Sequence, residues 1–193
     1  MMRGILYGLL ALLAIAAGAI AWSWTRISDT DAAYGGPFTL TDMRGQPITE
    51  QALRGHPSVV FFGFTHCPEV CPTTLFELNG WLAQLGDEGK DIKGFFFSVD
   101  PERDTPEVLG PYITNVTDRV TGITGSPEKM AEVIRDWRIY AKKVPTNDGQ
   151  DYTMDHTASI LLLNSRGGFE GTIAYGENGD TAMAKLKRLA AGS

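Results

Sequence analysis

The sequence predicts one α/β domain, in which helices flank a central mixed sheet, preceded by a segment directed to a membrane. Three observations predict it: apolar β-rich runs alternate with helical patterns, a strand hairpin and a helix close the chain, and a long uncharged stretch opens it. The length of 193 residues accommodates one domain of ordinary size plus an appendage. A hydrophobic content of 43% and a charged content of 21% are typical of a chain with a packed core.

The opening segment has no charged residue between Gly4 and Thr25. As a helix, Ile5–Trp24 spans about 30 Å, which matches the hydrocarbon core of a bilayer. We therefore expect residues 1–25 to form an N-terminal transmembrane helix, a single anchor in the inner membrane. A cleaved signal segment is the alternative, because Ala19-Ile20-Ala21 resembles a cleavage site. Either outcome exports the rest of the chain to the periplasm.

Residues 26–36 are polar and poor in apolar side chains, so we expect a linker there and the folded domain at 37–193. The domain opens with a hairpin of two short strands, Phe38–Thr41 and Pro47–Thr49. The continuous apolar runs Ser58–Phe64 and Gly94–Val99 are typical of buried central strands.

Helical patterns follow these strands. Leucines recur at helical spacing in Thr73–Leu85, and prolines open two further helices, Pro106–Ile113 and Pro127–Trp137. We expect the N-caps of the latter two helices to be Asp104 and Ser126. The remaining predicted elements are the strands Val120–Ile123 and Tyr140–Val144, the hairpin Ala158–Leu163 with Glu170–Ala174, and the helix Ala182–Ala191.

The order βαβα followed by ββα is that of the thioredoxin fold. In that fold the reactive cysteines lie where the first central strand gives way to its helix, and Cys67 and Cys71 lie there too. Two cysteines are too few for a disulfide framework, and their proximity predicts a local site. In an oxidising compartment such a pair tends to form a disulfide unless a metal or a reductant intervenes.

The charge balance narrows the choice of partners. Beyond residue 25 the chain has 16 basic and 23 acidic residues. This acidic balance argues against nucleic acid or an anionic membrane surface as the partner of the exported domain.

The chemistry is concentrated in Thr65–Pro72, whose cysteines have the spacing CxxxC and not the CxxC of disulfide oxidoreductases. Pro68 suits a first helical position, so we expect Cys67 at the N-cap, where the helix dipole favours thiolate. Positions i and i+4 of a helix face the same way, so both sulfurs can meet one metal ion. Thiolates favour Cu(I), with zinc and iron–sulfur clusters as competitors.

A further ligand is required, and the chain offers three histidines. His156 precedes Ala158–Leu163 at a junction that the thioredoxin fold places beside the cysteine helix, so we expect it to complete a Cys2His site. We expect His56 at the surface, and His66 to point away from the shared face.

Three further residues have alternative interpretations. Asp155 could orient the imidazole of His156, although adjacent side chains of an extended segment point apart. Met154 is either a weak thioether ligand or, as we expect, a core residue. Asp100 either tunes a ligand or assists docking, or it belongs to a turn and capping cluster.

Three blocks of the chain also carry a family resemblance: FFGFTHCPEVCPTTL, FFFSVDPERDTPEVL and DYTMDHTASILLLN. Their order and spacing resemble those of the Sco/SenC family of copper-delivery proteins, from about Phe38 to the last helix. The resemblance implies a thioredoxin fold with one copper ion held by Cys67, Cys71 and His156. It further implies delivery of copper to the dinuclear centre of cytochrome c oxidase subunit II, with another periplasmic copper chaperone or a thiol reductant as a further partner.

Two functions remain open. One is a copper metallochaperone without catalytic turnover. The other is a thiol–disulfide oxidoreductase that keeps the cysteines of the oxidase copper site reduced. A peroxiredoxin-like enzyme is disfavoured, because the chain lacks the Pro-x-x-x-Thr-x-x-Cys pattern. His156 separates the first two functions, since only the chaperone requires it as a ligand.

Overall fold

The structure is a computed structural model that describes residues 15–18, 33–146 and 149–192. It comprises two compact units, Met1–Asp31 and Ala32–Ser193. In the first unit residues 15–18 are helical. The rest of the expected membrane segment lies outside the described residues. Among the residues that are described, no helix combines the length and the apolar character needed to cross a bilayer.

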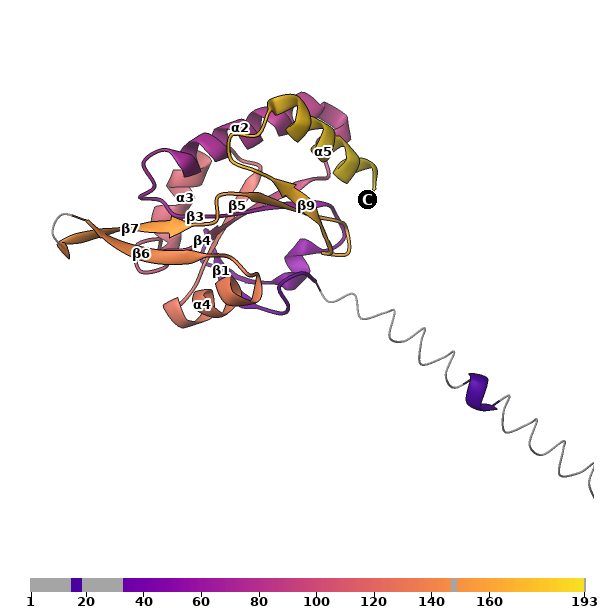
Figure 1. Ribbon diagram of the computed structural model, residues 1–193, viewed down its shortest axis with the longest axis horizontal. Helices are drawn as coiled ribbons and strands as arrows, with labels where there is room; N and C mark the ends of the chain where they lie inside the picture. The colour runs from indigo at the N-terminus through magenta and orange to yellow at the C-terminus, as the bar shows by residue number, and fades with distance from the viewer. Residues whose placement is uncertain (1–14, 19–32, 147–148, 193) are drawn as a thin grey trace, which may run out of the picture. The chain divides into compact units, whose positions relative to one another are not determined.

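Seven strands of the second unit form one mixed sheet, in the spatial order β2-β1-β5-β4-β3-β8-β9 (Figure 1). They are β1 (Thr39–Asp42), β2 (Pro47–Thr49), β3 (Ser58–Gly63), β4 (Lys93–Ser98), β5 (Val120–Thr124), β8 (Ile160–Leu163) and β9 (Phe169–Ile173). The central strands β3, β4 and β5 are parallel, whereas β1 and β8 join them antiparallel. The predicted mixed sheet and the predicted N-terminal hairpin are both confirmed.

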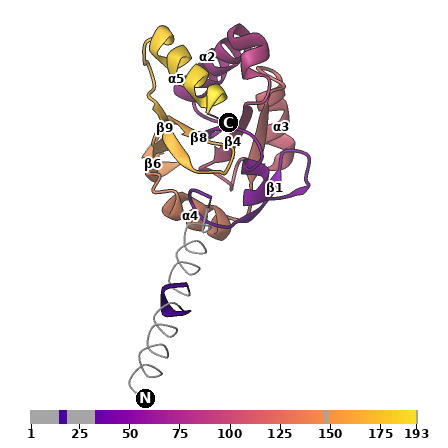
Figure 2. The same ribbon diagram turned by 90° about the vertical axis from the view of Figure 1, so that its right-hand side faces the viewer.

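Helices flank this sheet on both faces, as predicted. They are α2 (Val70–Leu85), α3 (Pro106–Thr114), α4 (Pro127–Asp136) and α5 (Gly179–Ala191), with short 3-10 turns at Glu50–Leu53 and Gly86–Gly89. Helices α2 and α5 lie side by side on one side of the sheet and α4 lies on the other (Figures 1 and 2). Helix α3 packs on β5 because Gly122 leaves room for Leu109 and Ile113, which lie 2.8 and 2.7 Å from where a Cβ would stand.

The core is built around the register of β3 with β4. Phe61 lies opposite Phe96, and Phe62 lies opposite Phe97. Because successive side chains of a strand point to opposite faces, each face of the sheet receives one aromatic pair. On the α4 side, Trp137 packs 5.4 Å from the ring of Phe62. These buried rings fix the end of β3 from which the cysteine segment departs.

A two-stranded sheet stands apart from the main one. It pairs β6 (Ala141–Thr146) with β7 (Asp151–His156) in antiparallel register, so that Ala141 lies opposite His156. The sequence predicted the first strand as Tyr140–Val144 but did not predict β7. The omission arose because the side chains of β7 are mostly polar and partly exposed, so the segment lacks a buried apolar run.

Two helix starts differ from prediction. Helix α2 begins at Val70 with Glu69 at its N-cap, so Cys67 lies in the preceding loop and is not the cap. Helix α3 has Thr105 at its N-cap and not Asp104, whose carboxylate instead accepts the backbone N–H of Thr65. The predicted cap of α4 is confirmed, since the Ser126 side chain accepts from the backbone N–H of Lys129.

Candidate metal centre

The two cysteines meet where a loop runs into the first turn of α2. Cys71 is the second residue of that helix, and its backbone N–H donates to the Cys67 sulfur over 3.3 Å. Pro72 is tolerated here because the first turn of a helix has no carbonyl partner for its N–H groups. The loop therefore brings the sulfur of Cys67 over the start of the helix. The prediction that the two sulfurs meet because they occupy positions i and i+4 of one helix is therefore wrong.

The third group, His156, is the last residue of β7. Its Nδ1 lies 2.9 Å from the carbonyl oxygen of Thr157, which makes Nδ1 the protonated nitrogen. The free Nε2 then faces the Cys71 sulfur at 3.6 Å. The rings of Phe61 and Phe64 stand edge-on to the imidazole, with centroids 6.2 and 5.7 Å away. A backbone carbonyl and two aromatic walls thus orient His156.

Cys67, Cys71 and His156 each offer one ligand atom, and these atoms lie within 4.8 Å of one another. Ligands bound at about 2.0–2.3 Å in trigonal or tetrahedral geometry stand roughly 3.5–4 Å apart, so a small inward adjustment brings all three to one ion. Two sulfurs and one imidazole are a donor set that soft or borderline metals such as Cu(I) prefer. The residues therefore fit a copper ion.

The two cysteines differ in protonation state. The hydrogen bond from the Cys71 thiol, aided by backbone N–H groups, lowers the pKa of Cys67 to about 4 against the effect of burial. The same hydrogen bond, together with burial, raises the pKa of Cys71 above its ordinary value. Cys67 is consequently a thiolate at neutral pH and Cys71 a thiol that points at it. Both are free cysteines.

The remaining histidines lie away from this group. The exposed His66 has its Nδ1 3.1 Å from the Thr65 hydroxyl, in keeping with the expectation that it points away. His56 lies 3.2 Å from the Ser58 hydroxyl and stacks on Phe95, so it is half-buried where the sequence predicted a surface residue.

The two residues before His156 have other surroundings. Asp155 is exposed and stands opposite Lys142 in the hairpin, so it does not orient the imidazole. Met154 packs against the core, as expected.

Two buried aspartates of the β4–α3 loop were only partly anticipated. Asp104 accepts from the backbone N–H and the hydroxyl of Thr65, at 3.2 and 2.6 Å, and from the Ser98 hydroxyl. Burial raises the pKa of the Asp104 carboxyl despite these bonds. Asp100 pairs with Arg103 and accepts from the Tyr152 hydroxyl at 2.8 Å. The sequence signal for these aspartates was their position after a buried strand. Their hydrogen-bond partners could not be predicted from it.

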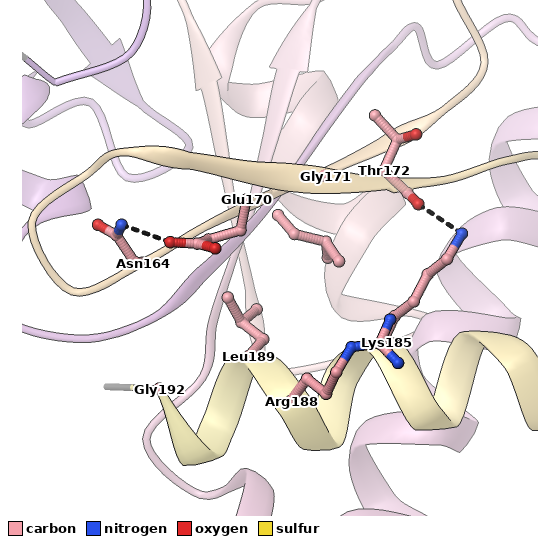
Figure 3. A pocket seen from close by; sticks show the side chains of 9 residues that line it. Asn164, Glu170, Gly171, Thr172, Lys185, Arg188, Leu189 and Gly192 are labelled. Carbon is pink, nitrogen blue, oxygen red and sulfur yellow. Dashed lines mark hydrogen bonds between the residues drawn. The ribbon is translucent and has the colours of Figure 1, made fainter.

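A hollow between β9 and α5 lies elsewhere on the domain (Figure 3). Two of its polar side chains have partners within it: the Asn164 amide donates to Glu170 at 2.7 Å, and the Lys185 ammonium donates to the carbonyl of Thr172 at 2.8 Å. None of the three metal-site residues lines it. It is therefore separate from the metal centre.

The fold and the site together define a thioredoxin-like domain that presents two sulfurs and an imidazole to one metal ion. Within that class the chain belongs to the SCO1/SenC family, whose profile matches residues 27–191.

Curated relatives support this assignment. Protein SCO2, mitochondrial, of Saccharomyces cerevisiae is 34% identical over 157 residues, which cover 80% of this chain and 52% of that protein. The SCO2-like protein RP587 of Rickettsia prowazekii is 39% identical over 134 residues, covering 69% of this chain and 65% of that one. The chain thus spans about half to two thirds of the length of these relatives.

Solved structures agree with the fold. Bradyrhizobium japonicum ScoI with copper bound has a TM-score of 0.74 at 46% identity, covering 81% of this chain and 99% of that one. Yeast Sco1 with copper bound has a TM-score of 0.75 at 32% identity, covering 83% and 90%. Both relatives hold copper, the ion that the donor set found here favours.

Proposed function

We propose that this chain is a copper carrier, which binds one copper ion through Cys67, Cys71 and His156 and delivers it to the dinuclear copper centre of cytochrome c oxidase subunit II. The observation that carries the proposal is the convergence of the three ligand atoms within 4.8 Å. The family supports it as well, since Sco proteins are copper-binding proteins of cytochrome c oxidase assembly.

The exposure of the ligands suits delivery. Cys71 is 0% exposed and Cys67 is 9% exposed, while His156 is half-buried. An incoming thiolate or imidazole of the acceptor therefore meets copper from the side of Cys67 and His156. A three-ligand site leaves a coordination position for that incoming group, so copper can pass by stepwise replacement of ligands without being released to water.

The cellular setting is part of the proposal. The apolar segment within residues 1–25 anchors the chain in the inner membrane, and residues 37–193 act in the periplasm beside the oxidase. Another periplasmic copper chaperone supplies the ion, or a thiol reductant restores the cysteines after oxidation. Copper is cargo in this scheme, and the chain needs no catalytic turnover.

The ligand set is tested by His156→Ala in the purified full-length chain, with His66→Ala as the matched control. Under reducing conditions we expect His156→Ala to lose stoichiometric Cu(I) binding and His66→Ala to keep it. X-ray absorption of the copper-loaded wild type should show two sulfur neighbours and one nitrogen neighbour. Unchanged copper affinity in His156→Ala would overturn the assignment.

A thiol–disulfide oxidoreductase is the second candidate, favoured by the free cysteines and the low pKa of Cys67. This function needs the cysteine pair and not the imidazole. Restoration of oxidase assembly by His156→Ala to the wild-type level, in cells that lack the native chain, would select the redox function. Failure of that variant, with its disulfide exchange intact, selects the copper carrier.

A further inference from the structure

The hairpin that carries His156 is not part of the main sheet. Among the residues that the structure describes, β6 and β7 pair only with each other, while the other seven strands form a separate hydrogen-bonded sheet. The pairing of β8 with β3 brings the end of β7 near the cysteines, but no backbone pairing joins the hairpin itself to the main sheet. Side-chain contacts between the hairpin and the domain therefore help to fix the imidazole relative to the sulfurs.

Tyr152 makes several of these contacts. It lies four residues before His156 in β7 and so on the same face of the strand. Its hydroxyl donates to Asp100 over 2.8 Å, and Asp100 is only 1% exposed. The Arg103 guanidinium lies 3.8 Å from the centre of the Tyr152 ring. A buried acceptor thus holds the tip of the side chain and a cation holds its ring.

Arg103 ties the backbone of the same strand. Its Nη1 donates to the carbonyl oxygen of Tyr152 at 3.0 Å and reaches the Asp151 carboxylate at 3.3 Å. Its Nε pairs with Asp100. The guanidinium is planar and bonds to Asp100 as well as to the backbone of β7. It therefore restricts the sliding and rotation of that strand.

The other strand of the hairpin is tied to the same loop. The Lys143 ammonium lies 4.6 Å from the centre of the Tyr152 ring and donates to Glu102 at 2.6 Å. Both strands of the hairpin are thus held by residues 100–103.

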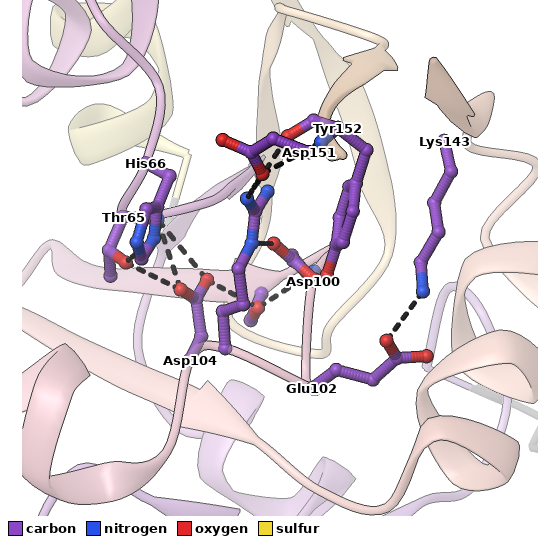
Figure 4. Close-up of polar contacts among 10 residues, drawn as sticks. Thr65, His66, Asp100, Glu102, Asp104, Lys143, Asp151 and Tyr152 are labelled. Carbon is purple, nitrogen blue, oxygen red and sulfur yellow. Dashed lines mark hydrogen bonds and ion pairs between the residues drawn. The ribbon is translucent and has the colours of Figure 1, made fainter. Parts of the chain in front are cut away.

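The same loop also holds the cysteine segment. Asp104 accepts two hydrogen bonds from Thr65, which stands two residues before Cys67 (Figure 4). Asp100 and Asp104 are themselves joined, because the backbone N–H of Asp104 donates to the carbonyl of Asp100 at 2.9 Å. One short loop therefore contacts both segments that supply metal ligands.

We propose that Tyr152 is a positioning residue for His156: held by Asp100 and Arg103, it sets the imidazole at bonding distance from the two sulfurs. The inference rests on the proposed copper-carrier function and adds a residue to it. Tyr152 contacts no ligand itself and acts through the strand that it shares with His156.

The test is a double-mutant cycle with Tyr152→Phe and His156→Ala, read as Cu(I) affinity of the full-length chain in competition with a chromogenic chelator. Tyr152→Phe keeps the ring and removes only the hydroxyl that donates to Asp100. We expect it to weaken copper binding about tenfold, the low end for outer partners of metal ligands. In the His156→Ala background only the weaker affinity of the two sulfurs is left to measure, and the same change should not lower it further, because the residue acts through the imidazole.

Tyr140→Phe is the matched control, since Tyr140 is 53% exposed and immediately precedes the hairpin. It should leave copper affinity unchanged. If Tyr152→Phe fails to fold, Asp100→Asn removes the ion pair with Arg103 and enters the same cycle. Unchanged affinity in the single variant, or equal losses with and without His156, would overturn the inference. A His156→Ala variant that binds copper normally would instead overturn the ligand set itself, so the two failures are distinguishable.

Discussion

The sulfur of Cys71 lies 3.6 Å from Nε2 of His156, although 85 positions separate the two residues in the chain. The topology brings them together. Strand β3 leads to the cysteines, and β8, which begins four residues after His156, pairs antiparallel with it so that Phe61 lies opposite Ile160. Since the end of one strand then lies beside the start of the other, the cysteine loop and the histidine hairpin emerge at the same edge of the sheet.

The ionisation of Cys67 should be measurable by alkylation of the metal-free, reduced chain. Because the Cys71 thiol and further hydrogen bonds lower the pKa of Cys67 to about 4, iodoacetamide should modify this residue at pH 5–6, where ordinary thiols with a pKa near 8.5 are inert. Mass spectrometry after proteolysis identifies the modified cysteine. In Cys71→Ala the midpoint of the reaction should move upward, since the main stabilising hydrogen bond is lost. An unshifted midpoint in that variant would contradict the assigned cause.

Copper uptake should release about one proton per chain at pH 7, and not two. Cys67 is already a thiolate at this pH, whereas the pKa of Cys71 is raised, so only Cys71 has a thiol proton to lose when it binds metal. Titration with Cu(I) in a weakly buffered solution under a pH-stat gives the count directly. Release of two protons would show that Cys67 is protonated before copper arrives.

Much of the fold followed from local sequence patterns. The apolar runs that become β3 and β4, and the leucine spacing of α2, have only one way to bury their side chains. The metal ligands were identified by a different route. Cys67 and Cys71 were conspicuous as a close pair, and the link to His156 came from the expected fold and the family resemblance.

The remainder depends on contacts that no local pattern encodes. The contact of Tyr152 with Asp100 joins residues 52 positions apart. Likewise, the Asp104 carboxylate serves Thr65, 39 positions away, and so is not available to cap its own helix. Strand β7 did have a signal: Tyr152, Met154 and His156 alternate with more polar residues at period two, a pattern too short and too polar to identify without the structure.

Removal of the Asp104 carboxylate should destabilise the reduced, metal-free domain. Asp104→Ala leaves the Thr65 N–H and two hydroxyls without their acceptor, so we expect a loss of about 2 kcal/mol in the free energy of unfolding. The exposed Asp91→Ala is the matched control and should change little. Urea denaturation of the three proteins measures both effects.

The loss of stability caused by Asp104→Ala should also depend on pH. Burial raises the pKa of Asp104 in the folded state above its unfolded value of about 3.9. A raised folded pKa contributes stability that is present below the unfolded value and is lost as the pH rises through the folded pKa. The gap between the wild type and Asp104→Ala should therefore be wider at pH 4 than at pH 7. A gap that narrows at low pH would show that the carboxyl is stabilised in its charged form.

Substitution of Gly35 should destabilise the folded unit more than substitution of the adjacent Gly36. Gly35 and Gly36 both have positive φ, at +81° and +74°, so alanine is strained at either position. A Cβ on Gly35 would in addition lie 2.0 Å from the indole nitrogen of the buried Trp137, whereas a Cβ on Gly36 would meet open space. We expect Gly36→Ala to lower the free energy of unfolding by about 1 kcal/mol, from backbone strain alone. Gly35→Ala should lower it by about 3 kcal/mol, because the overpacking of the Trp137 ring is added to the same strain.

Thermal and urea unfolding of the two variants, monitored by tryptophan fluorescence, measures the difference. Equal losses at the two positions would mean that this segment does not pack on Trp137 in solution, and that the folded unit begins after it.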